Sequence, residues 1–275
     1  EVVGGHAAVS TLSDVYAFAV LSFYVIAQTH PFLGSQVEEG GWEASVDLEE
    51  QAYAGALPWI EDEEDDANWS DKGIPRDLVL TPRLRRLFQQ TFGFGRQNAT
   101  LRPSMLEWAE ALHQSCDLTV KCRACGSTFY VPQRNCPWCA DSPSAELLYV
   151  EFRAWDPELD ADAYDAVLAS PPQWRMCLDL EEEGSIRRHA AEPSLLRDDD
   201  PPFIKVQPKR RSIRVTPVSE RAIFAVLPHE KRTEVIDGPK DLPLPSAGRE
   251  WHIHIGAPDS VHRMASFRLI RGAKS

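Results

Sequence analysis

The chain has 275 residues, of which 43% are apolar, and it carries 42 acidic against 29 basic side chains, a formal net charge of −13. At roughly 100–200 residues per domain, this length predicts two units, or three with a small one. The acidic balance disfavours nucleic acid as a partner, because a phosphate backbone requires a basic surface. The composition also excludes collagen, coiled coils and disulfide-dense miniproteins.

The first ten residues, EVVGGHAAVS, have neither the basic start nor the small-residue cleavage site of a secretory signal. Because they also lack an initiator Met, we expect the chain to begin inside a longer protein. The longest nearly apolar run, 15–27, is shorter than the roughly 20 residues that span a bilayer. It predicts a buried helix at the centre of a helical unit, with Phe18 and Leu21 in the core. We therefore expect a cytoplasmic protein without a membrane segment.

Residues 1–116 predict a helical unit. One helix begins near Ser10, Thr11 or Ser13 and ends near residue 28, and a weaker pattern covers 47–56. Thr81-Pro82 is typical of a helix start and precedes apolar residues at helical spacing. A last helix follows Arg102-Pro103-Ser104. The apolar positions expected to pack in these last two helices are Leu84, Leu87, Phe88 and Phe92, then Met105, Trp108, Ala109 and Leu112.

The segment from Pro31 to Asp71 contains thirteen acidic residues and no Lys or Arg, with a continuous acidic run at 61–66. Like charges at this density repel one another and favour a solvated loop. The alternative interpretation is a docking site for a basic partner.

Four cysteines lie in two closely spaced pairs, Cys122-x-x-Cys125 and Cys136-Pro-Trp-Cys139, with ten residues between the pairs. Each pair can form a tight turn whose two thiolates point at one ion, and two such turns supply the four tetrahedral ligands of structural Zn²⁺. The segment 117–142 therefore predicts a zinc ribbon with no open coordination position and no chemistry. A disulfide pair and an iron–sulfur or redox site are the alternatives.

The C-terminal half of the sequence has strand-like patterns in place of helical ones. Residues 143–202 predict a connector with some strand and helix, and 203–275 predict a β-rich domain. Strands are expected at 147–154, 212–216, 222–227, 232–236, 250–255 and 266–270, separated by Pro, Gly and Asp clusters. Such short antiparallel strands favour a sandwich or a barrel. The predicted fold class is thus α+β and multidomain: a helical unit, a small zinc ribbon and a β-rich domain.

Two weaker patterns lie in this half. His252 and His254 fall on one face of a strand with His262 nearby, which favours a polar sheet face over a metal site. The basic residues of 205–214 are expected to be solvated, to meet the acidic run, or to contact phosphate.

The start of the chain resembles the end of a protein-kinase catalytic domain. Glu1 is followed, after twelve residues, by Asp14-Val15-Tyr16-Ala17-Phe18, and the kinase Ala-Pro-Glu motif precedes a D-V-[WY]-[SA]-[FL]-G helix at similar spacing. Ala19 stands where that family has Gly. His30-Pro31-Phe32 matches the turn after the helix.

Leu101-Arg102-Pro103-Ser104 matches the start of the last kinase helix. The resemblance implies that Arg102 pairs with Glu1 and that Asp14 holds the backbone of the catalytic loop.

Within this family, the helical unit followed by Cys-Pro-Trp-Cys looks similar to bacterial Ser/Thr-kinase-like proteins of tellurium-resistance-type phosphorylation triads. That resemblance implies a signalling role with a protein substrate or partner, such as a von Willebrand A-type protein or a phosphatase. It does not extend to the β-rich region.

The chain has no His-Arg-Asp, Asp-Phe-Gly or Val-Ala-Ile-Lys motif, which phosphoryl transfer requires. We therefore assign no catalytic or cofactor-binding residue, and ATP and Mg²⁺ would bind only through upstream parts of a parent protein. Two hypotheses stay open: a C-terminal part of a Ser/Thr-kinase-like enzyme, inactive alone, and a non-catalytic scaffold or pseudokinase.

Overall fold

The computed structural model describes residues 10–131, 135–140, 146–158, 163–192, 200–227, 232–246, 250–257 and 259–270. The chain is a multidomain α+β protein that divides into two compact units, Glu1–Ser115 and Cys116–Ser275. Glu1 lies outside the described residues, and the ion pair expected between Glu1 and Arg102 therefore lies outside them too.

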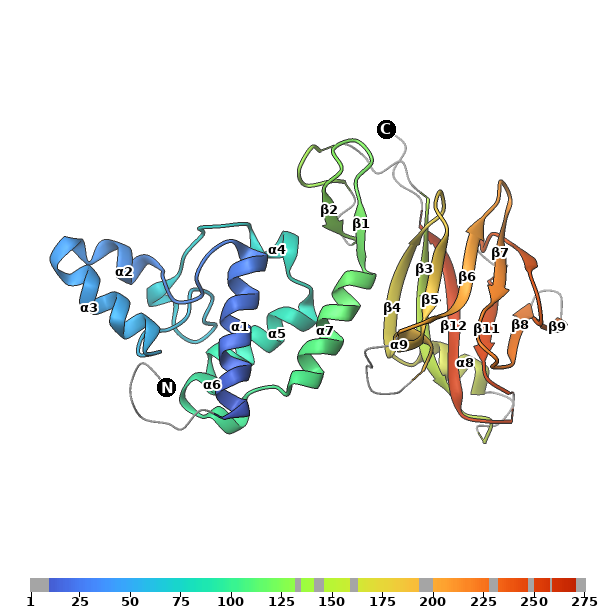
Figure 1. The fold of residues 1–275 in the computed structure, drawn as a ribbon, viewed down its shortest axis with the longest axis horizontal. Coiled ribbons are helices and arrows are strands. Elements are labelled where there is room, and N and C mark those ends of the chain that lie inside the picture. Colours follow the sequence, from blue (N-terminus) through green and yellow to red (C-terminus); the bar gives the residue numbers. More distant parts are fainter. Residues whose placement is uncertain are drawn as a thin grey trace. The chain divides into compact units, whose positions relative to one another are not determined.

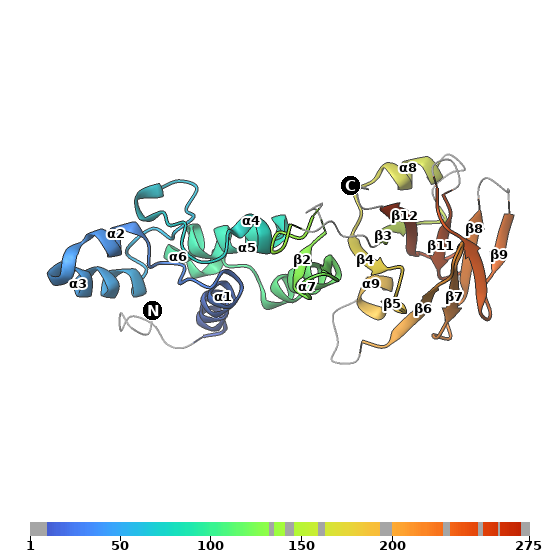
Figure 2. The ribbon, with the colours of Figure 1, turned by 90° about the horizontal axis from the view of Figure 1, so that it is seen from above.

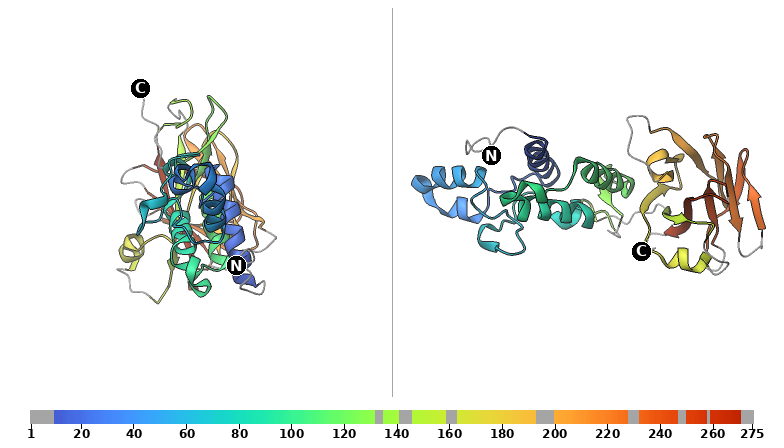
Figure 3. Two further views of the ribbon diagram at one scale, coloured as in Figure 1. Left: turned by 90° about the vertical axis from the view of Figure 1, so that its left-hand side faces the viewer. Right: turned by 90° about the horizontal axis from the view of Figure 1, so that it is seen from below.

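The first unit is helical (Figures 1 and 3). Its elements are α1 (Thr11–Ala27), α2 (Ser35–Glu39), α3 (Gly41–Tyr53), η1 (Asp66–Asn68), α4 (Arg76–Val79), α5 (Pro82–Phe92), α6 (Phe94–Gln97), η2 (Ala99–Leu101) and the greater part of α7 (Met105–Asp117). Two of the expected helix starts are confirmed. The Ser10 hydroxyl caps α1 by accepting from the Ser13 N–H, and the Thr81 hydroxyl caps α5 by accepting from the Leu84 N–H.

Helix α1 is buried along one stripe only. Val15, Ala19, Phe23 and Ala27 are buried, at the four-residue spacing that places side chains above one another on one face. On the opposite side Leu21, Tyr24 and Val25 are 62%, 55% and 59% exposed. The expectation that Leu21 is buried was wrong. The apolar run correctly predicts a helix, but burial of every side chain would require neighbours on all sides of it. The described helices of this unit pack against one side of α1.

The core of this unit is largely aromatic. The Phe23 ring makes edge contacts with Trp59, Phe88 and Phe92 at centroid separations of 5.8, 5.1 and 6.1 Å. In α7, Trp108 is fully buried and packs on Phe88 at 4.9 Å. Met105, which we expected on the same buried stripe, is 45% exposed, so the first turn of α7 faces solvent. These contacts join α1, α5 and α7 into one core.

The acidic run at 61–66 is built into the unit as well as solvated. Glu61 pairs with the buried guanidinium of Arg76 at 2.8 Å, and the Asp65 carboxylate caps η1 by accepting from the Ala67 N–H at 3.1 Å. Glu63, Glu64 and the other side chains of 63–66 are exposed. Part of the run therefore stabilises a turn, and the rest faces water as the solvated-loop interpretation expects.

The second unit contains two larger antiparallel sheets and a small hairpin (Figures 1 and 2). Its elements are β1 (Thr119–Lys121), β2 (Thr128–Tyr130), β3 (Leu147–Trp155), α8 (Ala163–Ala169), β4 (Trp174–Asp179), β5 (Gly184–Arg187), α9 (Arg188–Ala191), β6 (Pro202–Pro208), β7 (Ser212–Pro217), β8 (Ile223–Leu227), β9 (Arg232–Val235), β10 (Lys240–Pro243), β11 (His252–Ile255) and β12 (His262–Ile270).

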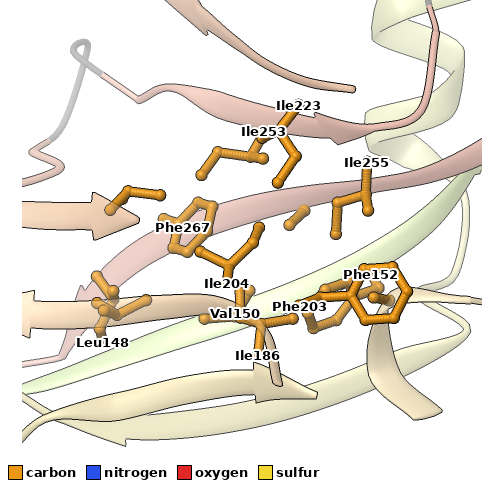
Figure 4. Close-up of a cluster of buried hydrophobic side chains, with 14 of the residues drawn as sticks. Leu148, Val150, Phe152, Ile186, Phe203, Ile204, Ile223, Ile253, Ile255 and Phe267 are labelled. Carbon is orange, nitrogen blue, oxygen red and sulfur yellow. The ribbon is translucent and has the colours of Figure 1, made fainter. Parts of the chain in front are cut away.

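The two larger sheets form a sandwich. The six-stranded sheet has the order β4-β3-β12-β11-β8-β9, and the four-stranded sheet has the order β10-β7-β6-β5. Inward-facing side chains of both sheets share one apolar core, in which residues of β3, β11 and β12 meet those of β5 and β6 (Figure 4). Because the strands that the structure describes form two separate sheets with a shared buried face, the arrangement is a sandwich and not a barrel.

Residues 143–202 contribute more than the expected connector. They supply β3 and β4 to the six-stranded sheet and β5 to the four-stranded sheet. In β4, burial alternates with Trp174, Met176 and Leu178 facing the core. Acidic and Pro-rich flanks on both sides of this short strand hid the alternation in the sequence.

Across the described ranges, no helix combines the length and the apolar character needed to cross a bilayer.

Candidate metal centre

The four cysteines lie on a small ribbon at the start of the second unit. Strands β1 and β2 pair antiparallel, with Val120 opposite Phe129. Phe129 is buried against Cys122 and Cys136, and Val120 packs on the same cluster. This apolar cluster is far smaller than the sandwich core, so the hairpin has little hydrophobic stabilisation of its own.

Each cysteine pair closes a turn with the same backbone pattern. The Gly126 N–H donates to the Cys122 carbonyl at 2.8 Å, and the Ala140 N–H donates to the Cys136 carbonyl at 2.9 Å. The residue after each pair has a left-handed backbone, with φ of 77° at Gly126 and 58° at Ala140. Glycine adopts that conformation without steric cost, which explains the glycine after the first pair.

The turns bring all four sulfurs together. Every Sγ lies within 4.8 Å of the other three. Cys122 and Cys139 are 3.7 Å apart, and Cys125 and Cys136 are 3.6 Å apart. Four thiolates around one tetrahedral ion at about 2.3 Å would lie about 3.8 Å from one another, whereas a disulfide requires about 2.05 Å. The cysteines expected as ligands therefore form a cluster that can hold a metal ion.

The surroundings of Cys125 favour its thiolate form. The backbone N–H of Ser127 and then its hydroxyl donate to the Cys125 sulfur, and they lower the pKa of this exposed thiol to about 6. A thiolate, and not a thiol, is the metal-ligating form. Away from the cluster, burial raises the pKa of Cys177 to about 12, and burial followed by the Asp117 charge raises that of Cys116. These two thiols are not part of the cluster.

The ribbon is fastened to the sandwich by charged contacts. Arg123, inside the first cysteine turn, donates to both carboxylate oxygens of Asp179 at 2.6 and 2.8 Å and also pairs with Glu181. Trp138, inside the second turn, donates its indole N–H to the Thr128 carbonyl at 2.8 Å, and the ring is 42% exposed. The role of Arg123 is not predictable from the sequence, because nothing local to a C-x-x-C motif indicates a partner 56 positions away.

The residues singled out by the kinase resemblance lie in the first unit. Arg102 is buried, and its guanidinium donates to the Leu12 and Gly95 carbonyls, both at 2.8 Å, and stacks 4.6 Å from the Tyr16 ring centre. Asp14 is exposed in the first turn of α1. The start of the last long helix is thus joined to the start of the first.

The histidines on the outer face of the six-stranded sheet come together in part. His254 Nδ1 lies 2.9 Å from His262 Nε2, and His252 hydrogen-bonds to Ser266. All three are buried. Burial, followed by the other two imidazoles, lowers the pKa of His254 to about 3. The cysteine cluster is the one group of three or more ligands that the described residues assemble, so these histidines form a buried polar sheet face.

No protein-family model, no curated protein and no solved structure matches the chain.

Proposed function

We propose that Cys122, Cys125, Cys136 and Cys139 bind one structural Zn²⁺. The sulfur separations support a tetrahedral ion, and four protein ligands leave no position for water or substrate. An iron–sulfur cluster also takes four thiolates, so metal identity is the property to measure. The apolar cluster under the sulfurs is small, and the ion therefore supplies much of the folding free energy of the ribbon.

We further propose that the chain is the C-terminal part of a bacterial Ser/Thr-kinase-like signalling protein, in which it docks a protein substrate or partner. The observation that carries this proposal is the buried Arg102, which ties the Arg-Pro-Ser helix start to the beginning of α1. The kinase resemblance rests on those same two segments. A von Willebrand A-type protein or a phosphatase is the partner class that the resemblance suggests, and the cytoplasm is the compartment that suits it.

The second candidate is a non-catalytic scaffold or pseudokinase. The sequence favours it because the motifs that bind ATP and Mg²⁺ are absent from these 275 residues. Under either proposal the chain positions partners and performs no phosphoryl transfer by itself.

The experiment that separates the two begins with any residues that precede Glu1 in the full-length protein. If they contain His-Arg-Asp and Asp-Phe-Gly motifs, the full-length protein should phosphorylate itself with ATP and Mg²⁺, and an Asp→Asn change in His-Arg-Asp should abolish that activity. If both motifs are missing and the full-length protein transfers no phosphate, the enzyme proposal fails and the scaffold stands. Phosphoryl transfer by the 275-residue chain alone would contradict both.

A further inference from the structure

A histidine in the second unit lies between two carboxylates. His189, in α9, places Nε2 2.7 Å from Asp117 Oδ2 and Nδ1 2.7 Å from Asp200 Oδ2. The imidazole side chain is 5% exposed, and the Asp117 and Asp200 side chains are 17% and 20% exposed. Asp117 is the last residue of α7 and lies two positions before β1, so this cluster links the start of the ribbon to the sandwich.

The number of protons in the cluster decides how many of its contacts are favourable. A carboxylate only accepts hydrogen bonds, and an imidazole donates from both nitrogens only as the imidazolium. The neutral ring has one N–H, and its other nitrogen would then direct a lone pair at a carboxylate oxygen 2.7 Å away. With both carboxyl groups ionised, two contacts of this length therefore require the charged ring.

We propose that Asp117, His189 and Asp200 form a proton-dependent latch, which fastens the start of the ribbon to the sandwich while the imidazole is charged and loosens when the ring loses a proton. The Asp117 contact is the one that opens. Asp200 has a second bond to the same residue, from the His189 backbone N–H at 3.0 Å, whereas the bond between Asp117 and His189 is made through the ring. After opening, Asp117 keeps its bond from the Trp174 indole at 2.7 Å.

Among the residues that the structure describes, the other charged groups near the latch have contacts of their own, and the Arg187 guanidinium donates to the Asp200 backbone carbonyl at 2.8 Å. Arg263, from β12, donates to the His189 and Ala190 carbonyls at 3.0 and 2.8 Å and approaches the backbone, not the ring. Arg188 pairs with Glu192 within the α9 segment, and Glu192 also pairs with Arg221. The Cys177 thiol, from β4, is close enough to Asp117 for that charge to raise its pKa, and it is neutral near pH 7.

The sign of the pH dependence follows from these contacts. Burial by itself lowers the pKa of His189, but the hydrogen bonds and charges of Asp117 and then Asp200 outweigh burial and leave the pKa above its usual value. A raised pKa in the folded state means that the latch is fully closed below the unfolded pKa of about 6.5. It opens as the pH rises through the raised pKa.

The test uses the whole chain loaded with zinc. Ring ¹⁵N NMR of wild type and His189→Gln assigns the His189 resonance and gives its pKa, which should lie above about 6.5. Hydrogen exchange is then followed on peptides covering 117–121 and corrected for intrinsic rates. In wild type, the protection factor of these amides should fall about tenfold between pH 6 and pH 9. His189→Gln, whose amide donates at one end only, should exchange like the open state at every pH.

His113→Gln, which removes an exposed histidine of α7 in the first unit, is the matched control and should retain the wild-type pH dependence. The proposal is overturned if His189 titrates at or below the unfolded value, or if wild type and His189→Gln share one pH profile. Should His189→Gln fail to fold, the wild-type titration decides, with the His189 ring resonance assigned through its connectivity to the His189 backbone.

Discussion

The packing of α1 makes a sharp prediction about two neighbouring aromatic residues. Phe23 is fully buried among Trp59, Phe88 and Phe92, whereas the next residue, Tyr24, is 55% exposed. Phe23→Ala removes a buried ring and its three edge contacts and leaves a cavity, at a cost of about 3–5 kcal/mol. Tyr24→Ala should cost less than about 1 kcal/mol, because it removes a ring that is already largely in water.

Both changes are measured by urea unfolding followed by hydrogen-exchange mass spectrometry on peptides from α1 and α5, which isolates the first unit from the second. The order of the two costs is the informative result. Equal losses in the free energy of unfolding would mean that the Tyr24 face of α1 is covered after all. A loss below about 1 kcal/mol for Phe23→Ala would refute the core described for this unit.

Three other outcomes follow from the contacts. Arg102→Ala should destabilise the first unit by about 1.5–3 kcal/mol, because it removes a buried guanidinium with its hydrogen bonds to the Gly95 and Leu12 carbonyls, whereas Arg83→Ala, at a side chain that is 27% exposed, should cost less than about 1 kcal/mol in the same urea assay. Gly73→Ala should cost at least about 1 kcal/mol and lower the melting temperature, because φ is +81° and a Cβ would lie 2.2 Å from the Ala27 carbonyl oxygen. Burial lowers the pKa of His254 to about 3, whereas an unfolded histidine titrates near about 6.5. The contribution of this residue to stability is therefore complete above about pH 6.5 and is lost as the pH falls towards 3. In His254→Gln, the free energy of unfolding should therefore depend less steeply on pH between about 6.5 and 4. A slope equal to that of wild type would contradict the lowered pKa of His254.

Features that depend on neighbouring residues were predictable from the sequence. The spacing of the cysteine pairs is local, and it correctly predicted which four thiols come together. The Thr81 cap with Pro82 fixed the start of α5, and regular alternation predicted β3, β7 and β8 closely. In each case the signal and the structure it produces lie within about a dozen residues.

Features that depend on distant residues were not predictable. Leu21 and Phe23 look equivalent in an apolar run, and only the packing of other helices decides which is buried. The latch joins Asp117 to His189 across 72 positions, and no spacing rule connects them. Burial of charged groups such as Arg102 likewise depends on which carbonyls the fold brings within reach.

Metal analysis of the purified chain tests the central claim most directly. Elemental analysis with X-ray absorption should find one zinc per chain, bound by four sulfurs at about 2.3 Å. Cys136→Ser should lose that zinc together with the protease resistance of 118–130, while the matched control Cys116→Ser, which changes a thiol outside the cluster, should keep both. A metal-free chain with disulfides among Cys122, Cys125, Cys136 and Cys139, or a Cys136→Ser variant that keeps full zinc occupancy, would contradict the account.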